Sequence, residues 1–158
     1  MQDVISRLTD NLAEERKAVN ALLDVLQEEQ DCLVAADISR LPQMTDEKAR
    51  IASRLSGLAK QRYDALAEAG FDASEAGMEK WANSANATVA VRDAWNELLS
   101  VARDGKERNR INGLMIQQQM SRNQNALHVL FAHAQGGNFY GPDGQATAKV
   151  GGRRLGAG

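Results

Sequence analysis

Histidine and cysteine side chains are the usual metal ligands and nucleophiles, and this chain has two histidines and one cysteine. His128 and His133 are five residues apart, so in a helix they point to different faces, whereas helical metal sites space their histidines by three or four residues. Cys32 has no second cysteine to pair with, and we interpret it as a small residue at or near a helix seam. The sequence therefore predicts no metal site and no cofactor.

The sequence also lacks the motifs that carry catalysis. It contains no glycine-rich phosphate loop, no cysteine pair, no nucleophile elbow and no metal-binding His-Glu motif. The Asp and Glu side chains fall at positions expected on helix surfaces, where they are solvated charges. We therefore predict that the protein is not an enzyme.

A row of amide side chains runs through the stretch from Asn109 to Met120 and beyond it. Taking every third or fourth residue gives a seven-residue repeat, with amides at four places where a stable helix seam would carry Leu or Ile. Two interpretations stay open: a buried amide row fixes helix register, whereas an exposed row is a surface for a partner helix. The row consists of Asn109, Asn112, Ile116, Gln119, Asn123, Ala126 and Leu130.

The elements that carry this row are predicted to be helices only. Ala, Leu, Glu, Gln, Arg and Met dominate, the chain has two prolines, and aromatic residues make up 4%, too few for a typical sheet protein. A length of 158 residues fits one ordinary domain. We expect an all-α fold in which long antiparallel helices form a coiled-coil-like bundle.

The first predicted helix extends from Asp3, a suitable N-cap, to Leu33. Nine positions follow one another at alternating spacings of three and four, and seven of them are apolar. The other two are Glu15 and Glu29. A narrow apolar stripe of this length needs a second helix packed against it.

The seam of the second predicted helix extends from Leu41 to Leu66. The helix ends at Gly70, a residue suited to a left-handed C-cap. Its seam includes two basic residues, Lys48 and Arg62. Because the turn before Pro42 is short, we expect the first two helices to form an antiparallel hairpin.

A connector with a short helix follows, carrying Met78 and Trp81 and weakened by Gly77. We expect Trp81 and Trp95 to anchor this connector to the next helix. That helix is predicted from about Thr88 to Ala134. It is either one long helix or is kinked or broken near Gly105 to give four helices, since one glycine permits a break without compelling it.

The helical residue pattern ends after Gln135. We therefore predict a helical bundle domain over residues 1–135 and a flexible glycine-rich tail over residues 136–158. The segment 136–145 cannot continue a helix, and the tail carries a net charge of about +2 from its Lys and Arg residues. A basic tail with the adjacent aromatics Phe139 and Tyr140 is either a recognition segment or a frayed terminus.

The charge and hydropathy of the chain exclude several classes of partner. A formal net charge of −2 without a clustered basic surface argues against nucleic-acid binding. The sequence has no secretion signal and no apolar run long enough to span a membrane, so we expect a cytoplasmic protein. Residues 1–35 are acidic and residues 103–122 are basic, so helices from these two segments can lie side by side.

These features together resemble the FlgN family of flagellar type III export chaperones, over nearly the full length. The resemblance is carried by the acidic first helix, the Ala-Asp-Ile-Ser-Arg-Leu turn at 36–41, the Asn109-x-x-Asn112-Gly-Leu-x-Ile116 pattern and the segment Phe139-Tyr-Gly-Pro-Asp-Gly144. It implies a cytoplasmic, non-enzymatic chaperone that binds the C-terminal segments of hook–filament junction proteins. Such a chaperone prevents premature assembly of its cargo and delivers it to the export gate.

We predict that the cargo segment binds along the long C-terminal helix, and that the aromatic pair of the tail docks on the export gate. The pair could instead fold back to cap the bundle. The predicted cargo-binding residues are Asn109, Asn112, Leu114, Met115, Ile116, Gln119, Asn123 and Leu127, and the predicted docking residues are Phe139 and Tyr140.

One alternative function stays open. The chain could be a structural coiled-coil or adaptor protein that acts through helix–helix self-association, without any handover of cargo. Self-association in the absence of cargo would favour this alternative.

Overall fold

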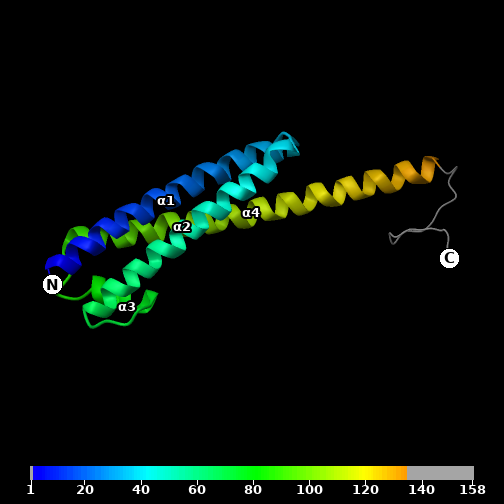
Figure 1. Cartoon of the computed structure of the whole chain (residues 1–158). Coiled ribbons are helices and arrows are strands. Elements are labelled where there is room, and N and C mark those ends of the chain that lie inside the picture. Colours follow the sequence, from blue (N-terminus) through cyan, green and yellow to red (C-terminus); the bar gives the residue numbers. More distant parts are fainter. Residues whose placement is uncertain (1, 135–158) are drawn as a thin grey trace. The chain divides into compact units, whose positions relative to one another are not determined.

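The computed structural model describes residues 2–134, and they form helices and turns without any strand (Figure 1). This confirms the all-α fold with its hairpin and long C-terminal helix. In chain order the helices are α1 (Gln2–Val34), the short 3-10 helix η1 (Ile38–Arg40), α2 (Leu41–Glu68), α3 (Glu75–Ala82) and α4 (Val89–Ala134).

The chain divides into two units, residues 1–113 and residues 114–158, each of which we describe by itself. α4 continues as a helix through Gly105, so it is not broken there. The predicted domain boundary after residue 135 lies at the edge of the described residues and stays a prediction. The predicted flexible tail, residues 136–158, lies outside the described residues.

In the unit of residues 1–113, α1 and α2 form the predicted antiparallel hairpin (Figure 1). The turn between them begins at Ala36, whose φ of 57° is in the left-handed region. The Asp37 amide then donates a hydrogen bond of 2.9 Å back to the Cys32 carbonyl, which closes the end of α1. Pro42 stands in the first turn of α2, where its missing N–H costs nothing.

The end of α2 is closed by the predicted glycine. Gly70 has a φ of 84°, and its amide donates to the Ala67 carbonyl at 3.0 Å. The Phe71 amide donates to the Leu66 carbonyl at 2.9 Å, which completes a Schellman motif. Phe71 then packs against the core, so the chain turns back towards α3.

The main core joins α1, α2, α3 and the first part of α4. Trp81 is completely buried and Trp95 nearly so, which confirms that these two residues anchor the connector to the long helix. Burying each large side chain contributes about 1.5–3 kcal/mol. The members of this cluster are Val4, Leu8, Leu12, Val19, Ala65, Leu66, Met78, Trp81, Ala82, Val91, Trp95 and Leu98.

The structure shows why position 77 is glycine, which the sequence alone did not. We expected it only to weaken the short helix, but it is buried, and a Cβ atom at this position would overlap the carbonyl oxygen of Asp72. Ser74 caps α3 by accepting a hydrogen bond of 3.0 Å from the Gly77 amide. The close approach of the loop before α3 therefore requires glycine.

We predict opposite effects for two Gly→Ala substitutions. Gly77→Ala should destabilise the protein by about 1–3 kcal/mol, because the methyl group forces the Asp72 backbone to move. Gly105→Ala should stabilise it by about 0.5–1 kcal/mol, because its Cβ would lie at ordinary contact distance, 3.8 Å, from Leu23. Urea unfolding followed by helical circular dichroism measures both changes, and equal effects of the two substitutions would contradict the prediction.

Candidate functional site

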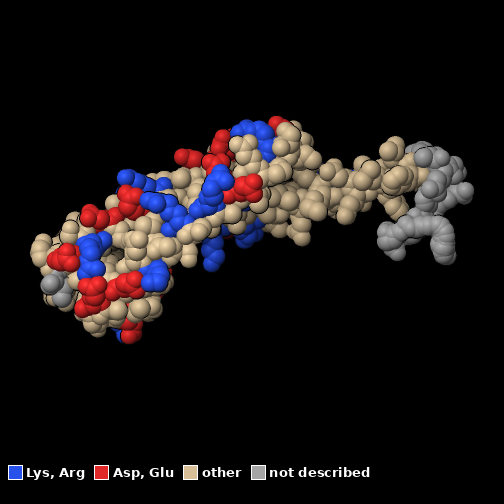
Figure 2. Space-filling view, in the orientation of Figure 1, with Lys and Arg blue, Asp and Glu red and all other residues tan. Residues whose placement is uncertain are grey.

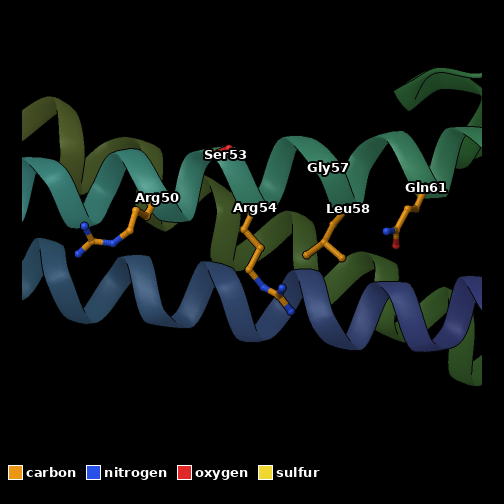
Figure 3. Close-up of a pocket in the computed structure, with 6 residues that line it drawn as sticks. All are labelled: Arg50, Ser53, Arg54, Gly57, Leu58 and Gln61. Carbon is orange, nitrogen blue, oxygen red and sulfur yellow. The ribbon is translucent and has the colours of Figure 1, made fainter.

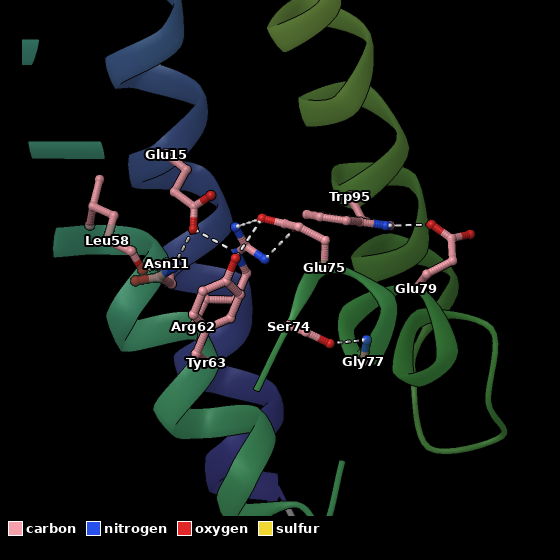
Figure 4. A network of polar contacts seen from close by, with 10 residues as sticks. All are labelled: Asn11, Glu15, Leu58, Arg62, Tyr63, Ser74, Glu75, Gly77, Glu79 and Trp95. Atoms are coloured by element: carbon pink, nitrogen blue, oxygen red, sulfur yellow. Dashed lines mark hydrogen bonds and ion pairs between the residues drawn. The ribbon is translucent and has the colours of Figure 1, made fainter. Parts of the chain in front are cut away.

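A buried arginine connects three helices of the unit of residues 1–113 (Figure 4). Arg62 of α2 is 3% exposed, and its Nε donates to Glu15 of α1 at 2.8 Å. Its two terminal nitrogens donate to Glu75 of α3 at 3.0 and 3.2 Å, while Tyr63 donates to the same carboxylate at 2.9 Å. The guanidinium also lies 4.9 Å from the ring centre of Trp95, which brings α4 into the contact.

The pKa shifts of Arg62 and Glu75 keep both of these groups charged at neutral pH. Burial works to lower the pKa of Arg62, but the hydrogen bonds to Glu15 and Glu75 outweigh it and raise this pKa above the ordinary value. Burial works to raise the pKa of Glu75, but the hydrogen bonds from Arg62 and Tyr63 hold it below the ordinary value. Arg62 and Glu75 therefore form a charged structural contact between α2 and α3.

A second buried carboxylate joins α1, α2 and α4. Glu29 is 1% exposed and forms an ion pair of 2.9 Å with Lys48 of α2. Asn112 of α4, also 1% exposed, donates its amide hydrogens to Glu29 at 3.0 Å and to the Leu26 carbonyl at 2.8 Å. Asn112 therefore fixes the position of α4 along α1, which is what the register interpretation of the amide row expects.

The predicted cargo-binding residues fall into two groups. Asn109 and Asn112 belong to the unit of residues 1–113, where Asn112 is buried and Asn109 is exposed and accepts a hydrogen bond of 3.4 Å from Lys48. The other six belong to the second unit. There Leu114, Asn123 and Leu127 are exposed, while Met115, Ile116 and Gln119 are half-buried. The binding role of all eight stays a prediction.

The described part of the second unit, residues 114–134, is one apolar and amide-rich helical stretch. Arg122 is its only Lys, Arg, Asp or Glu residue, and in Figure 2 the stretch next to the grey residues is uniformly tan. We call residues 114–131 the apolar stretch of α4. Its large exposed apolar residues are Leu114, Met120, Leu127, Val129, Leu130 and Phe131, each 48–61% exposed.

Part of this apolar stretch forms a continuous stripe along the helix. Ile116, Met120, Asn123, Leu127 and Leu130 follow one another at spacings of four, three, four and three, so they share one face. Such a stripe is the face that an amphipathic partner helix would cover. The chemistry available here is binding of an apolar protein segment.

Sequence reasoning missed two features of the site region. Met120, Val129, Leu130 and Phe131 were not among the predicted cargo-binding residues, although the near absence of charge after Gly113 was a signal for them. The two buried ion pairs were missed as well, although their acids and bases all stood at predicted seam positions. The pairs are Glu15 with Arg62 and Glu29 with Lys48.

The described residues contain no group of three or more His, Cys, Asp or Glu side chains that could hold a metal ion. None of the helices in residues 2–134 has the length and hydropathy needed to cross a membrane. Cys32 is a buried residue of the small cluster with Val25 and Met44.

Comparison with known proteins points to one family throughout. The family described as "FlgN protein" matches residues 1–148. A protein of Yersinia enterocolitica named "Flagella synthesis protein FlgN" is 30% identical over 156 residues, which cover 97% of this chain and 99% of the relative. The Salmonella typhimurium protein of the same name is 30% identical over 155 residues, which cover 96% and 99%.

A more divergent relative, also named "Flagella synthesis protein FlgN", comes from Proteus mirabilis. It is 26% identical over 149 residues, covering 93% of this chain and 94% of the relative. No solved structure matches the chain.

We predict that Arg62→Ala destabilises the protein by about 3–5 kcal/mol, because the buried carboxylate of Glu15 loses its countercharge. Arg54→Ala is the matched control: Arg54 lies on the same helix and pairs with Glu14, but its side chain is 58% exposed, so its loss should cost less than about 1 kcal/mol. Chemical denaturation of both variants measures the difference. Equal losses would show that the buried pair has no special structural role.

Proposed function

The chain belongs to the FlgN family of non-enzymatic flagellar chaperones, and from this premise we propose that it is a cytoplasmic export chaperone. It binds the C-terminal segments of hook–filament junction proteins and prevents their premature assembly. It then delivers these proteins to the flagellar type III export gate.

The exposed apolar stretch of α4 is the observation that carries this proposal. Its six large apolar residues are about half exposed or more, and a single arginine is the only charge nearby. Monomeric soluble proteins rarely leave so much contiguous apolar surface open unless it binds something. An unassembled axial protein has an amphipathic terminal segment that would otherwise self-associate, and such a segment can become helical when it packs on an apolar helix face.

Within the proposed cargo site, the exposed and half-buried residues have different roles from the buried amide. Leu127, Met120 and Leu130 offer the contact area, while Gln119 and Asn123 carry amides that can set the register of the bound segment. Leu114, Met115 and Ile116 extend the surface towards Gly113. Asn112 contributes from the other unit by fixing where α4 packs on α1, and Asn109 accepts a hydrogen bond from Lys48 of α2.

We further propose that Phe139 and Tyr140, which lie outside the described residues, contact the cytoplasmic part of the export gate. Aromatic residues in a glycine-rich segment can act as anchors for another protein without a core of their own. Cargo binding and docking would then reside in separate parts of the chain.

We predict that Leu127→Glu lowers the affinity for cargo at least about tenfold, or about 1.4 kcal/mol, because a charge would be buried in the contact. The variant should keep its melting temperature, because Leu127 is 52% exposed. Val89→Glu is the control, since Val89 is 67% exposed on the same helix but outside the apolar stretch. Titration calorimetry with the C-terminal segment of a hook–filament junction protein tests this, and unchanged affinity of Leu127→Glu would refute the site.

A chain truncated after Gly137 tests the docking role of the aromatic pair. We expect it to keep its melting temperature and its affinity for cargo, while losing binding to the cytoplasmic domain of the export gate in a pull-down. If truncation instead lowers stability and gate binding survives, the aromatic pair is a structural cap and the handover surface lies on the helices.

A further inference from the structure

A single amide interrupts the apolar stripe of α4 at its middle. Asn123 is the only polar member of the stripe, and Ile116 and Leu130 lie seven residues before and after it. Met120 and Leu127 lie between them, at three and four residues from Asn123. The stripe therefore has two apolar ends and one hydrogen-bonding centre.

The centre of the stripe is open to a partner side chain. Asn123 is exposed, and it makes no hydrogen bond or ion pair among residues 2–134. Ala126, the next residue of the amide row, is also exposed and has only a methyl group as its side chain. A helix that covers the stripe can therefore bring one of its own side chains against the Asn123 amide.

A shallow groove of about 420 Å³ along α2, beside Gly57, offers a different kind of surface in the unit of residues 1–113 (Figure 3). Leu58 is its one large apolar residue, and it is buried, so the groove gives an amphipathic helix little apolar area. The apolar stripe is therefore the better surface for such a helix. The groove is lined by Arg50, Ser53, Arg54, Gly57, Leu58 and Gln61.

Asn112 shows what an amide of the same row requires when another helix covers it. Asn112 is 1% exposed, and its Nδ2 donates to the Glu29 carboxylate at 3.0 Å and to the Leu26 carbonyl at 2.8 Å. Both of these groups only accept hydrogen bonds, so the Asn112 Oδ1 has no donor among the described residues. Lys48 pairs with Glu29 at 2.9 Å and supplies the countercharge that a buried carboxylate needs.

The surroundings of Asn123 favour an amide over a carboxylate as its partner. Arg122 is the only Lys, Arg, Asp or Glu residue of the apolar stretch, and it lies about 100° around the helix from Asn123, off the stripe. A carboxylate buried against Asn123 would therefore have no countercharge on the same face. A second amide has no charge to desolvate, and two facing amides can each donate and accept a hydrogen bond.

We propose that the segment bound here is a helix with one Asn or Gln at the centre of its apolar seam, opposite Asn123. This inference rests on the proposed chaperone function and specifies which cargo segments the site selects. Apolar residues stand three or four residues and seven residues away on both sides of the cargo amide. Because Asn123 is equally far from Ile116 and Leu130, the same pattern fits a parallel and an antiparallel segment. A segment bound in any other register leaves the Asn123 amide buried without a partner, which lowers its affinity.

The test is a titration of the full chain with synthetic helical peptides of about three heptads, at concentrations where each peptide is monomeric. Three peptides have Leu at the other seam positions and differ only in the central seam residue, which is Asn, Leu or Glu. The wild-type chain should bind the central-Asn peptide at least about tenfold more tightly than the other two. A fourth peptide, with its Asn moved by one heptad, should bind as weakly as the central-Leu peptide.

Two variants of the chain form a matched pair. Asn123→Leu should reverse the preference, so that the central-Leu peptide binds at least about tenfold more tightly than the central-Asn peptide. Asn125→Leu makes the same replacement in the same stretch, but on the opposite side of the helix, so it should keep the wild-type preference. Both residues are exposed, so both variants should keep the melting temperature of the wild-type chain.

Four results would overturn the proposal. They are failure of the central-Asn peptide to bind, equal affinities for the central-Asn and central-Leu peptides, tightest binding of the central-Glu peptide, and a preference that survives Asn123→Leu. Titration with the C-terminal segment of a hook–filament junction protein separates this proposal from the chaperone function. If that segment binds while the peptides are not distinguished, the chaperone function stands and the central amide is wrong. If the peptides are distinguished and that segment does not bind, the central amide stands and the cargo assignment is wrong.

Discussion

Two buried carboxylates in α1 determine how the other helices of residues 1–113 lie. Glu15 and Glu29 point into seams that are otherwise apolar, and each can stay charged there only if a cation and further donors reach it. Arg62 satisfies the first, while Lys48 and Asn112 satisfy the second. A shift of α2 by one turn would leave both charges buried without partners, whereas an all-leucine seam would tolerate several registers. The ion pairs therefore contribute uniqueness of register more than stability.

The same constraint reaches α3 and α4. Arg62 has donors left after it binds Glu15, and these bind Glu75 at the start of α3, which holds the connector against the hairpin. The close approach at Gly77 follows from this arrangement, because the loop from Phe71 to Ser74 must turn tightly to bring Glu75 to the arginine. At the other end of the hairpin, Asn112 donates a hydrogen bond to Glu29. The long helix is thus held by the contact of Trp95 with Arg62 near its start and by Asn112 near the end of the unit, with Leu98 adding apolar area between them.

Much of this fold could be predicted from the sequence because local signals were strong. The three- and four-residue spacing and Gly70 as a C-cap both act over a few residues, and the structure has each of them. The amide row was harder, because spacing places Asn109 and Asn112 on one stripe but cannot say which of them another helix covers. That depends on where α4 crosses α1, a property of the whole unit. The role of Gly77 could not be predicted for a similar reason. The carbonyl of Asp72 comes close to Gly77 only because of the way the loop before α3 folds.

The apolar stretch of α4 differs from the rest of the chain in how it remains compatible with water. The surface of residues 1–113 carries acids and bases side by side (Figure 2), whereas the stretch uses amides such as Gln117, Gln118 and Asn125. Removing an amide from water costs much less than removing a charge, and an amide can both donate and accept hydrogen bonds. A surface of this composition can therefore be covered by a partner at low desolvation cost, whatever the sign of the partner's charge. Its selectivity must then come from the spacing of its apolar residues and the geometry of its amides, because one arginine supplies almost no electrostatic discrimination.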